Sequence, residues 1–161
     1  MTGSGAYHVG HMNFGLLRGA WDSPVVAEFV NAVEHVNALA ARTPGFVVNI
    51  GGDELHQQLA VADDPIVSDP NAAVTLSVWE DAAALNHFVH KTLHGAFLRR
   101  RSDWFVPLDR ATYVVWPIVA GHRPTIAEAL DRLKHLEENG PTADAYDLSW
   151  SAANLVGDQN A

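Results

Sequence analysis

Four stretches of the chain have the residue pattern of a β-strand. In the first, Met12, Phe14 and Leu16 alternate with His11 and Asn13, and this period of two is typical of a strand with two different faces. The predicted strands cover residues 6–17, 45–50, 73–80 and 111–119.

Two helices have clear start and stop signals. The first is expected to begin with Ser23 as its N-cap and Pro24 at its first position, and to end before the sequence Thr-Pro-Gly. A later helix begins with Thr125 and Glu128, which have the spacing of a capping box, and ends at Gly140.

Between these two helices, apolar residues at helical spacing predict a further helix from Asp81 to about Trp104. Residues 51–72 have no regular period. An irregular segment of this length is uncommon unless it contains a small element or covers a site. The segment after Pro141 is expected to add a short strand and then to fray.

The predicted order is β-α-β-β-α-β followed by a third helix, which is the ferredoxin-like order of an α+β protein with two helices on one face of an antiparallel sheet. The other face must also be covered. Pairing two such sheets would cover it, so we expect a homodimer with a dimeric α+β barrel. The chain is expected to form one domain over residues 1–161, with a core over 7–147 and a flexible C-terminal tail.

The composition of this 161-residue chain excludes several kinds of partner and several kinds of site. The formal net charge of −9 argues against a nucleic-acid partner. The absence of cysteine excludes disulfides and thiolate metal sites. No apolar run reaches the length of a membrane helix, and the first residues do not have the pattern of a signal peptide. We therefore expect a cytoplasmic protein that acts away from membranes.

Three histidines, His87, His90 and His94, lie in the helix predicted between Asp81 and Trp104. At about 100° per residue, His90 and His94 fall beside the apolar stripe, and His87 falls in solvent. His90 and His94 have the spacing of two ligands on one helix, but the glutamate of the HExxH pattern is absent, so we expect no metal site. They remain candidates for acid/base chemistry, for axial ligation of haem, or for ordinary boundary positions.

The same predicted helix carries three further candidates. Arg100 falls inside the apolar stripe, where it either covers apolar surface with its stem or clamps a carboxylate. Phe97 and Trp104 fall at the edge of the stripe, on the side of the histidines. We expect these three residues to bind substrate.

Asn13 and Trp79 lie on the more polar faces of their predicted strands, together with His11 and Ser77. Each has an ordinary structural explanation, which is a satisfied polar residue for Asn13 and packing at a strand end for Trp79. If this face looks toward the helix of the three histidines, these side chains converge on one pocket. If it looks toward a dimer partner, they do not.

Nearly the whole chain, about residues 7–147, resembles the domain-of-unknown-function 3291 family. The resemblance is carried by "HVGHMNFGLLRGAWDSP", by "GFVV" after "NALAARTP", by "LSVWEDAAALNHFVHKTLHGAFLRRRSDWF" and by "VVWPIVAGHRPTIAEALDRLKHLEENGPT". It implies the dimeric α+β barrel superfamily but no particular activity.

That superfamily includes antibiotic-biosynthesis monooxygenases, which oxidise polycyclic phenols without a cofactor, and haem-degrading monooxygenases. Both place an Asn on the first strand, a Trp at the end of the third and often a His on the second helix. Asn13, Trp79 and His94 resemble that set, with His90 as a competitor for the histidine.

The chain differs from the usual pattern of the family at two places. It has Asn49 at the end of "GFVVN" where relatives tend to read "GFVWR", and His90 in "FVHK" where they tend to read "FVYR". Both changes favour a larger pocket, in which Asn49 and His11 would contact a bulky apolar substrate.

Three functions follow as hypotheses. The first is a monooxygenase-like oxidoreductase, or a related cyclase or isomerase, acting without a cofactor on a hydrophobic, polyketide-like molecule between sheet and helix. There His94 or His90 would move a proton, Asn13 and Trp79 would polarise a carbonyl or oxygen, and Arg100 would anchor an acidic group. The second is a haem protein with His94 or His90 as axial ligand, and the third is a non-catalytic ligand-binding module.

Overall fold

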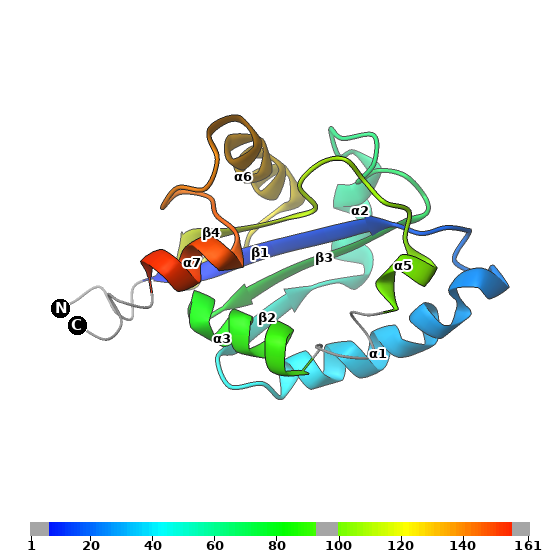
Figure 1. Ribbon diagram of the computed structural model, residues 1–161, viewed down its shortest axis with the longest axis horizontal. Coiled ribbons are helices and arrows are strands. Elements are labelled where there is room, and N and C mark those ends of the chain that lie inside the picture. Colours follow the sequence, from blue (N-terminus) through cyan, green and yellow to red (C-terminus); the bar gives the residue numbers. More distant parts are fainter. Residues whose placement is uncertain (1–6, 93–99, 156–161) are drawn as a thin grey trace.

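A four-stranded antiparallel sheet forms the centre of the protein (Figure 1). The computed structural model describes residues 7–92 and 100–155. The strands are β1 (Tyr7–Leu16), β2 (Phe46–Ile50), β3 (Ala72–Trp79) and β4 (Tyr113–Val119), in the spatial order β2-β3-β1-β4. This is the ferredoxin-like order, so the predicted α+β fold is confirmed.

One face of the sheet is covered by α1 (Ala27–Ala41) and α3 (Ala82–His87), which lie together below the sheet in Figure 1. The start of α1 follows the sequence signal. Ser23 Oγ accepts a hydrogen bond from the backbone N–H of Val25 at 3.3 Å, and a 3₁₀ turn (Pro24–Val26) leads into the helix. We call this side of the sheet the α1/α3 face.

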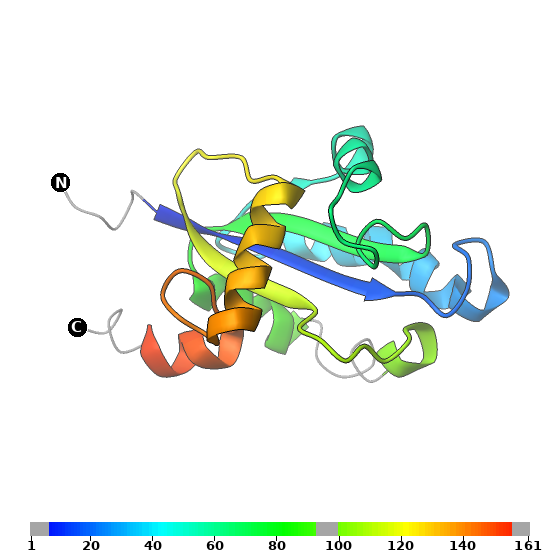
Figure 2. The same ribbon diagram turned by 90° about the horizontal axis from the view of Figure 1, so that it is seen from above.

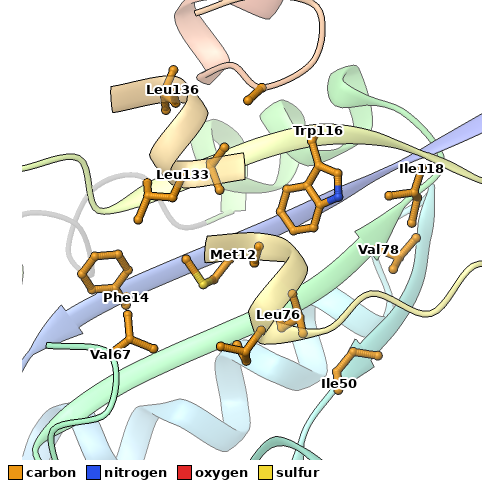
Figure 3. Packing of buried hydrophobic residues seen from close by; sticks show 14 of the residues in the cluster. Met12, Phe14, Ile50, Val67, Leu76, Val78, Trp116, Ile118, Leu133 and Leu136 are labelled. Atoms are coloured by element: carbon orange, nitrogen blue, oxygen red, sulfur yellow. The ribbon is translucent and has the colours of Figure 1, made fainter. Parts of the chain in front are cut away.

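The opposite face is covered by α6 (Ile126–Asn139) and α2 (Gly52–Ala60), which Figures 1 and 2 show on the other side of the strands. The largest apolar cluster of the described residues fills this layer (Figure 3). It contains Met12, Leu76 and Trp116 from the sheet and Leu133 from α6, all fully or almost fully buried. The dimer was expected because this face seemed to need a second sheet. That reason was wrong, because α6 and α2 of the same chain cover the face; the dimer itself stays a prediction.

The N-terminus of α6 forms half of the predicted capping box. Thr125 Oγ1 accepts a hydrogen bond from the backbone N–H of Glu128 at 3.1 Å. The Glu128 carboxylate does not return to Thr125 but accepts from Trp116 Nε1 at 2.8 Å and lies 2.6 Å from His122 Nε2. Glu128 therefore ties the start of α6 to the buried indole of β4.

The helix predicted from Asp81 to Trp104 is not regular. The α-helical part, α3, ends at His87, and a π-helical segment (Phe88–Thr92) follows it. A short helix, α5 (Arg101–Trp104), begins beyond the undescribed residues 93–99. A π-helix has a wider turn than an α-helix, so the constant step of about 100° per residue does not hold within Phe88–Thr92.

The two irregular segments contain helices. Residues 51–72 contain α2, as their length suggested. The segment after Pro141 forms α7 (Leu148–Asn154) rather than a strand, because the Asp147 carboxylate caps the backbone N–H of Trp150 at 2.8 Å. Its strand-like part is one bridge, in which Tyr146 and Val115 exchange two backbone hydrogen bonds. The packed core therefore extends through α7, beyond the expected end at residue 147.

No helix within the described ranges is long and apolar enough to cross a membrane.

Candidate functional site

The packing of Trp79 shows which way the more polar face of β1 and β3 points. Trp79 and Val9 pack in one buried cluster with Leu85 and Phe88, which belong to α3 and the π-helical segment after it. Side chains alternate along a strand, so His11 and Asn13 on β1 share the face of Val9, and Ser77 shares the face of Trp79. The polar residues of both strands therefore point to the α1/α3 face.

Two apolar clusters lie on this face. The first, which we call the Trp79 cluster, joins one end of the sheet to α3 and α7 and includes Val9, Trp79, Leu85, Phe88, Val115 and Leu148. The second, the Trp104 cluster, lies around the start of α1 and α5 and consists of Leu17, Val26, Phe29 and Trp104 with partly buried neighbours such as Ala73 and Phe105.

Six polar side chains occupy the strand positions between the two clusters. Asn49 pairs with Ser77, and Ser77 pairs with His11, across β2, β3 and β1. In the next row, Thr75 pairs with Asn13 and Asn13 pairs with Tyr113, across β3, β1 and β4. We call these six residues the polar band: His11, Asn13, Asn49, Thr75, Ser77 and Tyr113.

The polar band is open to solvent at the middle of the sheet. Asn13 and Thr75 lie on the two central strands, where side chains are normally covered, yet both are exposed, as is Asn49. Ser77 is buried, with 7% of its surface exposed. A site for a mostly apolar ligand combines apolar surroundings with a few polar groups, and this face of the sheet has both.

Among the titratable groups of the band, His11 has the pKa that is shifted furthest from its ordinary value. Burial lowers its pKa to about 4, so the imidazole is neutral at pH 7. Its ring centroid lies 5.9 Å from that of Tyr113 in an edge-on arrangement. Within the described part of the chain, no residue forms a hydrogen bond with the His11 imidazole. One ring nitrogen is therefore available as a donor and the other as an acceptor.

Tyr113 is held in place by α7. Its Oη accepts a hydrogen bond from the backbone N–H of Leu148 at 3.0 Å, and burial raises the pKa of its phenol. Tyr113 also lines a groove of about 300 Å³ at the outer side of β4, together with Arg110, Thr112, Leu136, Asp147 and Ser149. Tyr113 therefore borders both the polar band and that groove.

Trp79 has its polar atom bound within the protein. Its Nε1 donates to Ser77 Oγ at 3.1 Å, and only 1% of the residue is exposed. The indole stacks on Phe88 at a centroid distance of 5.2 Å and meets Phe46 edge-on at 5.3 Å. This geometry places Trp79 inside the apolar cluster, with its N–H turned toward Ser77.

Arg100 and Trp104 lie at the Trp104 cluster, away from the pairing rows of the polar band. The Arg100 guanidinium donates to both carboxylate oxygens of Glu28, at 2.8 and 2.9 Å, and to Asp103 at 2.8 Å. It also lies 5.3 Å from the centroid of the Trp104 ring. The hydrogen bonds from Arg100 lower the pKa of Glu28, so this ion pair is present at neutral pH.

The histidines of the predicted helix are only partly described. His87 ends α3 and His90 lies in the π-helical segment, and both are exposed. The two other candidates from this stretch, His94 and Phe97, lie outside the described residues. Among the residues that are described, no group of three histidine, aspartate or glutamate side chains could hold a metal ion.

Sequence reasoning missed three residues of the band, Thr75, Ser77 and Tyr113, as site residues. Tyr113 had no local signal, because its position opposite Asn13 depends on the register between β1 and β4. A check of which polar residues share a face with Trp79 along the third strand would have found Thr75 and Ser77.

The fold and the band define a single-sheet, ferredoxin-like α+β protein with an uncharged polar surface under its first helices. The chain belongs to the family described as "Domain of unknown function (DUF3291)", whose model matches residues 8–158. No match was found among curated proteins.

The similarity to solved structures is low. One is SnoaB, a cofactor-independent oxygenase from Streptomyces nogalater, which is 22% identical with a TM-score of 0.38, the match covering 74% of this chain and 97% of that one. Another is the NE2512 protein of unknown function from Nitrosomonas europaea, at 7% identity and a TM-score of 0.46, covering 74% and 95% of the two chains. At these values neither likeness indicates an activity for this chain.

Proposed function

We propose that this protein is a small-molecule enzyme, a monooxygenase-like oxidoreductase that binds a hydrophobic substrate on the polar band. The observation that carries the proposal is the band itself, six uncharged polar side chains between two apolar clusters on one face of a sheet. Side chains of central strands on a face that helices cover are usually apolar, so the exposed Asn13 and Thr75 at this place favour a ligand-binding surface.

The residues of the band suit a neutral ligand. The partly buried members of the two clusters, such as Phe46 and Ala73, would take the hydrocarbon body. The Asn13 amide would hold a carbonyl or a developing oxyanion. None of the six side chains carries a fixed charge, and the pKa of His11, at about 4, keeps its imidazole neutral at pH 7. Arg100 is already paired with Glu28 and Asp103. A phenol or enol therefore fits better than a carboxylate.

The reaction that fits such a substrate is oxidation of a phenol by molecular oxygen without a cofactor. Loss of the phenolic proton makes the ring electron-rich. The ring then reduces oxygen and forms a carbon-bound hydroperoxide, which loses water to leave a quinone. Overall, the phenol and one oxygen molecule give the quinone and one water. A cyclase or isomerase would use the same proton transfer and consume no oxygen.

Oxygen uptake with a panel of hydroxynaphthalenes and hydroxyanthracenes tests the proposal. We expect uptake with at least one member and a product that has gained one oxygen and lost two hydrogens. Asn13→Ala should abolish it, whereas the matched variant Asn37→Ala, at an exposed position of α1, should not. Turnover of no panel member, or equal loss in both variants, would count against the proposal.

Hemin tests the haem alternative in the same preparation. A Soret band that forms with added hemin and disappears in His90→Ala or His94→Ala would replace the proposed function by a haem-dependent one. Ligand binding by the panel without any product would favour the non-catalytic module.

A further inference from the structure

The position of His11 connects the polar band to acid/base chemistry. His11 lies on the central strand β1, with Ser77 opposite it on β3 and Val115 opposite it on β4. Asn13, the next residue on the same face, is exposed to the same open surface. A substrate whose oxygen is held by Asn13 therefore has an imidazole as its nearest neighbour along the strand.

We propose that His11 is the catalytic residue that takes the proton from the substrate O–H at the polar band. The inference rests on the proposed function and assigns its proton transfer to a strand residue instead of the helix residues His90 and His94. The substrate O–H bond breaks, a bond forms between that proton and a ring nitrogen of His11, and the electron pair stays on the substrate oxygen.

His11 suits this role because its ring is neutral and has no hydrogen-bond partner among the described residues. In the neutral ring one nitrogen keeps a lone pair, and neither nitrogen is bound by another described residue. Its strand neighbours are Ser77 on β3, Val115 and Tyr113 on β4, and Asn13 on β1, none of which is ionised at neutral pH. Burial and, to a lesser extent, the carboxylate of Asp147 at the start of α7 raise the pKa of Tyr113, whereas burial is the cause of the pKa shift at His11.

Burial makes His11 a weak base in the empty site, and the bound substrate changes this. Transfer of the proton leaves an oxyanion beside the imidazolium, and an adjacent opposite charge raises the pKa of a histidine. In a site of low dielectric constant this attraction is stronger than in water. At neutral pH, His11 therefore accepts a proton only when an acidic O–H is bound.

The other described histidines do not share this position. His8, also on β1, has the opposite parity and points to the face covered by α6. His90 is exposed in the π-helical segment, and His56 is exposed on α2, on the opposite side of the sheet. His56 is therefore a suitable control position, and His94 is the rival that an experiment must include.

A coloured ligand tests the proton transfer without turnover. 4-Nitro-1-naphthol should be bound at a pH below its own pKa, where the free compound is the colourless phenol. We expect the naphtholate absorption band on binding to the wild type and to His56→Gln, and no such band with His11→Gln, although tryptophan fluorescence shows that the ligand is still bound. Glutamine keeps a hydrogen-bonding side chain but cannot accept the proton.

Turnover gives the second readout. General-base catalysis contributes about 10²–10⁴-fold, so His11→Gln should lose activity on that scale with little change in KM. The loss should shrink as the pH rises toward the pKa of the phenol, because the substrate then ionises without help. Two results would overturn the assignment. In the first, His11→Gln is as active as His56→Gln. In the second, His94→Gln loses activity on the scale expected for His11→Gln, while His11→Gln itself is unaffected.

The two proposals fail in different ways. If bound nitronaphthol ionises through His11 but no phenol consumes oxygen, the assignment of His11 stands and the oxygenase function fails. If phenols are oxidised while His11→Gln is unaffected, the function stands and the assignment fails.

Discussion

The indole N–H of Trp79 donates a hydrogen bond to the hydroxyl of Ser77, two residues earlier on the same face of β3. Both side chains are buried, with 1% and 7% of their surfaces exposed. The bond joins the apolar end of the α1/α3 face to the polar band. It also means that a substrate oxygen could reach the indole N–H only by displacing Ser77, which is why the proposed function gives the polarising role to Asn13 alone.

A double-mutant cycle measures this bond. Ser77→Ala leaves a buried indole N–H without an acceptor, which costs about 1–3 kcal/mol of unfolding free energy. In the Trp79→Phe background the same change should cost clearly less, because the donor is already gone. Urea denaturation of the four proteins gives the coupling energy. Equal costs of Ser77→Ala in both backgrounds would show that the bond contributes nothing.

The pKa of His11 predicts how stability depends on pH. Burial lowers it from 6.5 in the unfolded chain to about 4 in the folded one, so between these values the unfolded state binds more protons. Stability should therefore fall as the pH drops from 6.5 to about 4, by about 3 kcal/mol from this group, and the contribution should not change above 6.5.

Urea denaturation at several pH values checks this dependence. His11→Gln should remove the part of the slope that lies between pH 6.5 and 4, while the exposed control His56→Gln should retain the wild-type slope. Identical pH profiles for wild type and His11→Gln would show that His11 is not buried as a neutral ring.

Arg100 is expected to be structural. Its guanidinium is shared by Glu28 and Asp103, which ties α5 to the start of α1. Arg100→Ala should therefore leave the KM of neutral substrates unchanged and resemble Glu28→Gln in thermal unfolding. Steady-state kinetics of Arg100→Ala and Glu28→Gln test whether Arg100 is structural. A KM that rises for Arg100→Ala alone, and most for a substrate with a carboxylate, would restore the anion clamp expected from the sequence.

Local rules were sufficient for much of the fold. Alternation along β3 placed Thr75, Ser77 and Trp79 on one face, and short-range capping at Ser23 and Thr125 located two helix starts. These features depend on residues within a few positions of each other. Parity alone therefore placed Asn13 with His11 and Trp79 with Ser77, and the pairing of β1 with β3 puts all four on one face.

The remaining features depend on contacts between distant residues. Whether the face of Asn13 looked toward the helices was settled by the packing of Trp79 on Phe88, and the covering of the other face by α6 was settled by Trp116 and Leu133. The π-helical segment Phe88–Thr92 gives His90 an angular position that a regular helix does not predict. His11 received only a minor role because nothing near it in the sequence indicates burial.

The indole of Trp116 packs against the backbone of Gly10 on the α6 side of the sheet, where a Cβ at Gly10 would come within 2.7 Å of the ring. Trp116 is completely buried and its N–H is bound by Glu128, so the ring cannot withdraw without losing that bond. Gly10→Ala should therefore destabilise the protein by about 1–3 kcal/mol, the usual cost of overpacking.

Thermal and urea unfolding test this contact, with Gly51→Ala as the control. A Cβ at Gly51 meets only the end of the Asn49 side chain, at 3.3 Å, so that variant should remain close to wild type. Because Gly10 faces away from the polar band, the folded fraction of Gly10→Ala should still ionise bound nitronaphthol as the wild type does. Loss of that signal at full folding would show that the two faces of the sheet are coupled, and unchanged stability would show that Trp116 does not occupy the space above Gly10.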